Sequence, residues 1–171
     1  INGRRSGNMV DYENFIRLAH YFNAIHIIGN QVTSPLELPA NNRHLDTYHA
    51  NLRLSDLSFH CTAIGRGRAL DGINMMAIAR GISTEKMADD PGVITIISLN
   101  SPRLLDGEMT DGLMVMAEHN QPVAVTPFTL MGAMTPVSLA AALAQQNAEA
   151  LFGVVLTQLV RTGAPVMYGA F

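Results

Sequence analysis

Polar and aromatic side chains recur where short apolar runs end and helical patterns begin. These positions are Asn30, His60 with Cys61, Ser98 with Asn100, Thr126 with Phe128, and Tyr168. Their amide, hydroxyl and imidazole groups can hydrogen-bond a ligand, and the two rings can face a cation. A single polar residue at a strand end commonly caps a helix or satisfies loop backbone instead. The set is therefore more informative than any one member.

The histidine and cysteine pattern does not indicate a metal site. None of the six histidines stands in an H-E-x-x-H motif, and no Cys/His ligand spacing is present. Cys61 is the only cysteine, which excludes an internal disulfide and a cysteine-rich metal cluster. No Ser/His/Asp set, Schiff-base lysine or paired carboxylates can be recognised either. We predict no metal site, and the residues alone identify no catalytic group.

The segment GRGR at residues 65–68 follows a predicted strand and opens a predicted helix, which is the setting of a phosphate-binding loop. The third glycine of a G-x-G-x-x-G fingerprint would fall at Leu70, so no dinucleotide site is predicted. Two interpretations of the arginines stay open: they clamp a carboxylate or face a partner protein, or they form a solvated loop. His119 and the pair Asp89-Asp90 lie in turns that lead into strands, at the opposite edge of the sheet.

A cluster of polar residues interrupts the long apolar helix that is predicted near the C-terminus. The cluster consists of Gln145, Gln146, Asn147 and Glu149. Gln146 and Glu149 are three residues apart and therefore share a face of the helix. Without partners, a buried carboxylate would cost several kcal/mol. The face is thus either the solvent stripe of an amphipathic helix or a buried polar set directed toward the site or a subunit contact.

Five helical patterns and five strand-like runs alternate along the chain. The helical patterns cover residues 11–23, 42–55, 69–80, 106–118 and 135–162, with Asn42 and Thr135 as expected N-caps. The strand-like runs cover residues 25–28, 57–62, 93–99, 123–126 and 166–168. Pro136 would then occupy the first position of the last helix.

This alternation predicts an α/β domain with a parallel sheet and right-handed crossovers. An open doubly wound sheet and part of a (β/α)8 barrel both fit the pattern. A complete barrel has eight strands and typically about 250 residues, and this chain begins without methionine and stops beside a strand. We therefore expect residues 1–171 to form one partial barrel domain of a longer protein. In either architecture, the ligand site is expected at the edge where the strands end.

The composition narrows the class of protein. Of the 171 residues, 48% are apolar and 15% are charged, so the chain is too hydrophobic to be disordered and fits one folded domain. The formal net charge is -3 without a basic stripe, which argues against nucleic-acid binding. The apolar runs are broken before the roughly 20 residues that span a bilayer, and no signal pattern opens the chain. With a lone cysteine, a soluble cytoplasmic protein without a membrane contact is expected.

Four segments of the C-terminal half form a distinctive combination. They are NSPRL at residues 100–104, PFTLMGAMTPVSLA at 127–140, AQQNAEAL at 144–151 and GAPVMYG at 163–169. Together they resemble the trimethylamine methyltransferase family over about the last 75 residues. The earlier units fit the fold of that family more loosely. Each segment alone is weak, whereas the combination is specific.

The resemblance implies a (β/α)8 TIM barrel with a polar cavity at the carboxyl ends of its strands. It also implies transfer of a methyl group from a tertiary or quaternary amine, trimethylamine or a betaine, to the Co(I) corrinoid of a cognate partner protein. The corrinoid is then the methyl acceptor, and the chain itself binds no cofactor. Family members that use trimethylamine carry pyrrolysine in a segment that would lie beyond Phe171, so the resemblance does not select one amine.

On this resemblance, the site must hold a positively charged ammonium, which needs aromatic faces or nearby anions. Phe128, Tyr168 and Glu149 can supply them. The expected substrate-binding residues are Asn30, His60, Asn100, Thr126, Phe128, Glu149 and Tyr168. Phe128 and Tyr168 are expected to matter more than His119 or Asp90.

If the chain is a partial barrel, its activity and its assembly can also be predicted. A chain that lacks three of the eight barrel strands should be inactive by itself. Its unpaired edge strands and uncovered apolar face should be hidden by self-association, so a homo-oligomer is expected. The alternative from another functional class is a non-catalytic α/β domain that binds a ligand or assembles with another chain.

Overall fold

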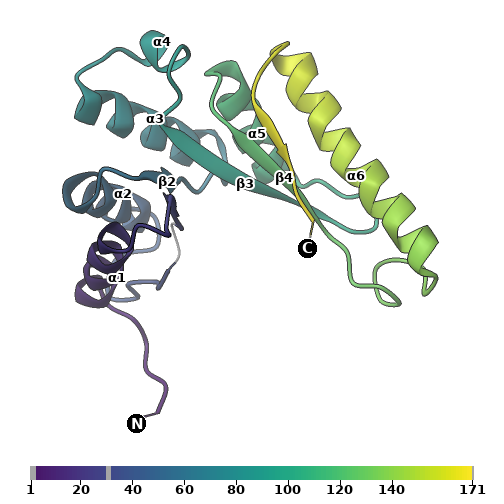
Figure 1. Ribbon diagram of the computed structural model, residues 1–171, viewed down its shortest axis with the longest axis horizontal. Helices are drawn as coiled ribbons and strands as arrows, with labels where there is room; N and C mark the ends of the chain where they lie inside the picture. The colour runs from purple at the N-terminus through teal and green to yellow at the C-terminus, as the bar shows by residue number, and fades with distance from the viewer. Residues whose placement is uncertain (1–2, 30–31, 171) are drawn as a thin grey trace.

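A five-stranded parallel sheet runs through the computed structural model, which describes residues 3–29 and 32–170 (Figure 1). The strands are β1 (Ile27–Ile28), β2 (Ser58–His60), β3 (Val93–Asn100), β4 (Val123–Phe128) and β5 (Val166–Tyr168). They lie side by side in the order in which they occur in the chain, and neighbouring strands are parallel. The predicted parallel sheet is therefore confirmed.

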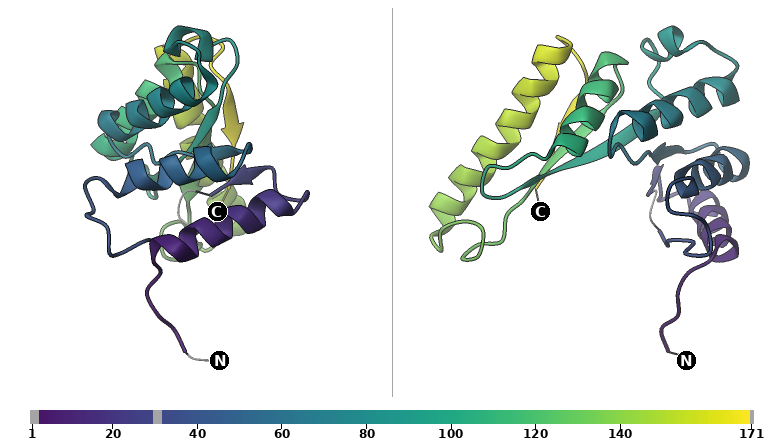
Figure 2. Two further views of the ribbon diagram at one scale, coloured as in Figure 1. Left: turned by 90° about the vertical axis from the view of Figure 1, so that its left-hand side faces the viewer. Right: turned by 180° about the vertical axis from the view of Figure 1, so that it is seen from behind.

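The main helices form one layer against this sheet. They are α1 (Met9–Tyr21), α2 (Arg43–Leu54), α3 (Arg66–Arg80), α5 (Gly107–Glu118) and α6 (Leu139–Val160), and the short helix α4 (Thr84–Met87) packs beside α3. Helices α1, α2, α3, α5 and α6 pack against one another in that order, and Figure 2 shows them around the outside of the strands. On the opposite face, the apolar strand residues Ile27, Ile96 and Met167 are exposed.

A sheet with sequential strand order and one helical layer is consistent with part of an α/β barrel. A doubly wound sheet would instead carry helices on both faces and reverse its strand order at a switch point. Residues 3–29 and 32–170 show neither feature. The partial barrel is thus the better fit of the two architectures that the sequence allows, although five strands alone do not show closure into a barrel of eight.

The core lies between the sheet and the helical layer. Its largest fully buried side chains include Tyr12 of α1, Tyr48 of α2, Phe59 of β2, Ile73 of α3 and Leu113 of α5. Full burial of such a side chain contributes about 1.5–3 kcal/mol. Because helices α1, α2, α3 and α5 each supply one of these residues, the core holds these four helices onto the strands.

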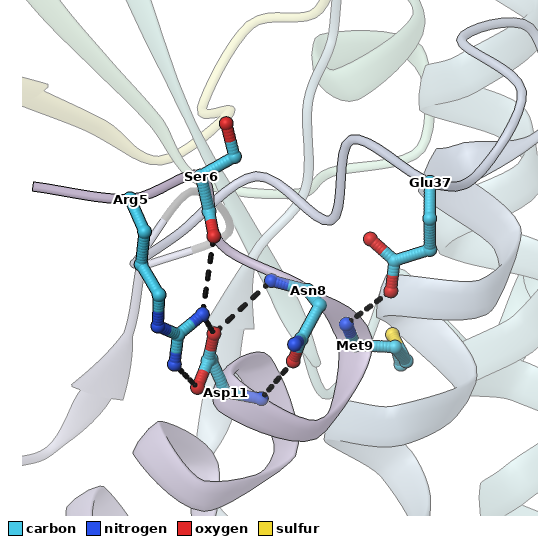
Figure 3. A network of polar contacts seen from close by, with 6 residues as sticks. All are labelled: Arg5, Ser6, Asn8, Met9, Asp11 and Glu37. Carbon is cyan, nitrogen blue, oxygen red and sulfur yellow. Dashed lines mark hydrogen bonds and ion pairs between the residues drawn. The ribbon is translucent and has the colours of Figure 1, made fainter.

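Polar contacts fix the start of α1 (Figure 3). The Asn8 side chain accepts a hydrogen bond from the backbone N–H of Asp11, and the Asp11 carboxylate accepts one from the backbone N–H of Asn8. Arg5 pairs with the same carboxylate, and Glu37 accepts from the backbone N–H of Met9. This capping box places the first residue of the helix at Met9, two residues before the predicted start.

The segment 65–68 belongs mostly to a helix rather than to a loop. Gly65 stands at the N-cap of α3 with a φ of +80°, a conformation that glycine adopts most readily. The helix therefore begins at Arg66, three residues earlier than predicted. Asn42 does occupy the N-cap position of α2, but its side chain makes no capping bond. Helix α4 was not predicted, because it is a single short turn that is capped by Ser83.

Helix α6 begins later than predicted. Ser138 occupies its N-cap position, and Pro136 lies outside the helix. Residues 130–135 form a closed turn instead, in which the N–H of Gly132 donates to the carbonyl of Thr135 and the N–H of Thr135 donates to that of Leu130. The prediction of Thr135 as the N-cap is wrong because this turn occupies its backbone before the helix can begin.

Helix α6 is long and apolar enough to pass a length and composition test for a membrane span. It has 22 residues and a mean hydropathy of 1.3. The polar cluster at residues 145–149 interrupts the apolar run of this helix, but its mean hydropathy is still 1.3. Only 17% of this apolar stretch is buried, and α6 packs against β3, β4 and β5 with Gln146 and Glu149 on its buried side.

Candidate functional site

Alternation along β4 divides its side chains between two faces of the sheet. Val123 and Val125 belong to the core beneath the helices. Because successive side chains of a strand point to opposite faces, Thr126 and Phe128 point to the uncovered face. They lie in the last half of the strand, close to its carboxyl end.

The register between β3 and β4 brings two more predicted residues to the same place. Ile97 is a core residue, so its neighbour Ser98 faces away from the helices. Ser98 lies opposite Thr126, and Asn100 lies opposite Phe128. The hydroxyl oxygens of Ser98 and Thr126 are 3.4 Å apart. We call these four residues the open-face group.

The open-face group offers neutral contacts. Two hydroxyls and one amide can donate or accept hydrogen bonds, and one aromatic ring can face a cation. None of the four side chains ionises near neutral pH, so they can hold and orient a ligand but cannot act as a general acid. Across residues 3–29 and 32–170, no group of three or more His, Cys, Asp or Glu could hold a metal ion.

His60 lies apart from the open-face group. Phe59 is in the core, so His60 points to the other side of β2. In the sheet, His60 pairs with Ile94, which precedes Ser98 by four residues or about 13 Å along the strand. The structure therefore does not bring His60 together with the ends of β3 and β4.

The surroundings of His60 keep its imidazole neutral. Burial lowers the pKa of His60 to about 4. Its Nε2 is buried and has no hydrogen-bond partner among the residues that the structure describes. Protonation would place a charge in these buried surroundings, which disfavours the imidazolium form.

We expect His60 to make the protein less stable as the pH falls. The unfolded chain protonates this residue near pKa 6.5, whereas the folded chain does so near 4. The stability is therefore intact above about pH 6.5, is lost through the window down to about pH 4, and changes by about 3 kcal/mol in total. Urea unfolding of the protein and of a His60→Leu variant across this window measures the difference, and the variant should have the shallower pH dependence.

The control for this measurement is His49→Gln. His49 is an exposed histidine of α2, so its removal should leave the pH dependence of the wild type unchanged. A His60→Leu protein that still loses as much stability as the wild type would show that His60 is not the residue responsible.

Glu149 lies on the helix side of the sheet and uses its carboxylate for contacts within the protein. Only 2% of the residue is exposed. The carboxylate accepts hydrogen bonds from the Ser101 hydroxyl, from the backbone N–H of Arg103 at 2.9 Å and from the Gln145 amide at 3.0 Å. Of the two interpretations of the polar cluster, the buried set thus applies to Glu149, which ties the middle of α6 to the loop after β3.

Tyr168 also lies on the helix side. Its hydroxyl donates to Oδ1 of Asn147 on α6, 3.2 Å away. The next residue, Gly169, faces Thr126, because a Cβ added to Gly169 would meet the Thr126 side chain. The Tyr168 ring and the Phe128 ring therefore lie on opposite faces of the sheet. Asn30, the remaining predicted contact, lies outside the described residues.

The other candidates, Cys61, His119 and Asp90, are buried in the core or bound to neighbouring groups of the protein. Cys61 is buried in the core, and burial raises the pKa of its thiol to about 12, which makes it a poor nucleophile. The Nδ1 of His119 lies 2.9 Å from the carbonyl of Val115 at the end of α5, and Asp90 pairs with Arg80. His119 and Asp90 both lie in segments that enter strands, away from the open-face group.

The two arginines of segment 65–68 have different contacts. Arg66 pairs with Glu118 of α5 at 3.0 Å. Arg68 instead lines a small cavity together with Arg43 and His44 of α2. Arg43 and His44 were not among the predicted site residues, because no spacing rule connects the first turn of one helix with that of the next.

The family model for trimethylamine methyltransferase matches residues 1–171. The chain belongs to the trimethylamine methyltransferase family. The glycine betaine methyltransferase of Desulfitobacterium hafniense strain Y51 is 34% identical over 167 residues, which is 98% of this chain and 35% of that protein. The proline betaine:corrinoid methyltransferase of Eubacterium limosum is 36% identical over 81 residues, or 47% of this chain and 17% of that protein. The trimethylamine methyltransferase of Methanosarcina barkeri strain Fusaro is 33% identical over 90 residues, or 53% of this chain and 18% of that protein.

These matches confirm the resemblance that residues 100–169 carry. The trimethylamine methyltransferase family match also covers residues 1–99, where the likeness in the sequence is looser. This member of the family spans about a third of the length of the glycine betaine methyltransferase, since 35% of that protein is covered.

Proposed function

We propose that this chain is part of a methyltransferase that moves a methyl group from a quaternary amine to the corrinoid of a partner protein. The observation that carries the proposal is the family match over the whole chain. The open-face group supports it, because polar and aromatic side chains at the carboxyl ends of parallel strands are placed where α/β barrels bind their ligands. Closure of the sheet into a (β/α)8 barrel is part of the proposal.

A betaine is the methyl donor that we infer. The match to the glycine betaine methyltransferase covers 98% of the chain, whereas the match to the Methanosarcina barkeri trimethylamine methyltransferase covers 53%. A betaine carries both a quaternary ammonium and a carboxylate. The ring of Phe128 can face the ammonium, and the hydroxyl and amide groups of Ser98, Asn100 and Thr126 can donate to the carboxylate.

The chemistry of the leaving group also favours a quaternary donor. The corrinoid supplies a Co(I) nucleophile for the methyl carbon, and the electron pair of the carbon–nitrogen bond leaves with the amine. A quaternary ammonium departs as a neutral tertiary amine and needs no proton, so a site of neutral side chains is sufficient. A neutral tertiary amine would have to be protonated first. The open-face group would hold the donor with one methyl group directed away from the sheet.

We expect Phe128→Leu to weaken the binding of glycine betaine. A cation–π contact contributes about 0.5–1 kcal/mol when exposed and about 2 kcal/mol when desolvated. The dissociation constant should therefore rise by up to about thirtyfold. Leucine keeps most of the apolar bulk and removes the ring face, which isolates this contribution. Calorimetry on the full-length protein, after a check that each variant is folded, measures the affinity.

Tyr168→Leu is the matched control for this experiment. It removes a ring from the other face of the sheet, where the hydroxyl is bound to Asn147, so glycine betaine affinity should stay at the wild-type value. Equal losses in the two variants, or normal binding by Phe128→Leu, would rule out the open-face group as the ammonium site.

The partners and the assembly are also part of the proposal. The name of the Eubacterium limosum relative specifies a corrinoid, which supports a corrinoid protein as the acceptor here. The exposed apolar residues Ile27, Ile96 and Met167 lie on the face of the sheet that further strands or another copy of the chain would cover. We infer a soluble, cytoplasmic homo-oligomer, and we expect the chain by itself to be inactive because its sheet builds one side of a cavity.

A further inference from the structure

A small cavity lies between the first turn of α2, the first turn of α3 and the loop that precedes α2. Its volume is about 90 Å³. Arg43 and His44 of α2, Arg68 of α3 and the loop residues Thr33 and Ser34 are among the residues that line it. The cavity shares no lining residue with the open-face group, and the methyl-transfer proposal does not use it.

Two arginines of this cavity lack an acidic partner. Within residues 3–29 and 32–170, neither Arg43 nor Arg68 forms an ion pair with a carboxylate. Their terminal nitrogens donate to the backbone carbonyls of Leu38 and Ala40 instead. The Nε of Arg43 is buried and has no partner in the same part of the chain. Among the described residues, the contacts that these two guanidinium groups make are thus with backbone carbonyls and not with carboxylates.

His44 adds a third basic group, and its ring is held in place by a contact with Asp71 outside the cavity. Its side chain is 11% exposed, and its Nε2 lies 2.7 Å from Oδ2 of Asp71. Its Nδ1 is buried without a hydrogen-bond partner among the described residues. Asp71 does not line the cavity, and neither does any other aspartate or glutamate that the structure describes.

We propose that this cavity binds one oxyanion group, a carboxylate or a phosphate, of a small molecule. A guanidinium presents its N–H groups in a planar fork that matches the oxygens of either group. The first turn of α2, which supplies Arg43 and His44, adds the partial positive charge of a helix N-terminus. A volume of about 90 Å³ admits one such group.

Inorganic phosphate is the probe for this site, and isothermal calorimetry on the full-length protein is the measurement. The wild type should bind phosphate. Arg68→Gln and Arg43→Gln should each weaken that binding by about tenfold or more, because each removes a charge-assisted contact. Acetate is then added as a competitor: displacement of phosphate supports a carboxylate as the natural group, and retention supports a phosphate.

Arg66→Gln is the matched control. It removes the same charge from the same turn of α3, but its guanidinium pairs with Glu118 outside the cavity, so phosphate affinity should not change. A second measurement is Tm by circular dichroism, which phosphate should raise in the wild type and in Arg66→Gln. Absence of both heat and a Tm shift in the wild type, or an equal loss of affinity in Arg66→Gln, overturns the proposal.

Discussion

Replacing Gly112 by alanine is expected to lower the free energy of unfolding by about 3 kcal/mol or more. Gly112 lies on the buried face of α5, and an added Cβ would lie 2.6 Å from the carbonyl carbon of Ala63 and closer still to its oxygen. These are backbone atoms of the segment after β2, so they cannot rotate aside. Either α5 or that segment must move, and the packing of α5 on the sheet loosens. Urea unfolding followed by circular dichroism measures the loss.

Gly67→Ala is the matched control for this substitution. Gly67 lies in the first turn of α3, and nothing lies within 4 Å of a Cβ added there. Alanine should therefore raise the free energy of unfolding by about 0.5–1 kcal/mol through its better helix propensity. If Gly→Ala stabilises the protein at position 67 and destabilises it at position 112, the loss at position 112 is due to packing and not to the helix propensity of alanine. A Gly112→Ala protein that is as stable as the wild type would contradict the close approach of α5 to Ala63.

The second large effect is expected from Glu149→Gln, which should cost about 2–3 kcal/mol although the two side chains have nearly the same shape. The Ser101 hydroxyl, the Arg103 N–H and the Gln145 amide all donate to this carboxylate. A glutamine side chain has one acceptor oxygen, so its own NH2 must face at least one of these donors; if that donor is Ser101, its hydroxyl must turn to accept and loses its carboxylate partner. Because the residue is 2% exposed, water cannot replace the lost partner. The free energy of unfolding in urea is the measurement.

Two further variants test the cause of this effect. Glu118→Gln changes an exposed glutamate that pairs with Arg66, and it should cost less than about 1 kcal/mol. Ser101→Ala should cost less in the Glu149→Gln protein than in the wild type, because the two residues share a hydrogen bond. If the two losses simply add, Ser101 and Glu149 do not interact in the way that the structure shows.

The order of the elements could be predicted from local patterns, but several of their ends could not. The run at 93–99 is β-branched and bounded by Gly and Pro, so its strand is identified without tertiary information. The start of α1 depends partly on Glu37, which lies 28 residues from Met9. The start of α6 depends on how residues 130–135 close into a turn. The contact with Glu37 forms only when the chain has folded, so no local pattern contains it.

The sequence predicts at which edge of the sheet the candidate site lies, but it does not predict on which face of the sheet each side chain lies. The strand-end rule selects both Phe128 and Tyr168, yet one residue of shift along a strand reverses the side on which a side chain lies. Register and core packing decide this, and they place Phe128 on the open face and Tyr168 beside α6. Likewise, the sequence could not decide between solvent and burial for Glu149, because its partner Ser101 is 48 residues away.

The sequential order of the strands has a consequence for how the protein folds during synthesis. Each strand pairs with the one that left the ribosome just before it, so β1 and β2 can associate while β3 is still being translated. Every later strand then joins an edge that already exists, and the loop that must close is never longer than one helical crossover. The nascent chain never has to wait for a distant segment before it can bury its newest strand.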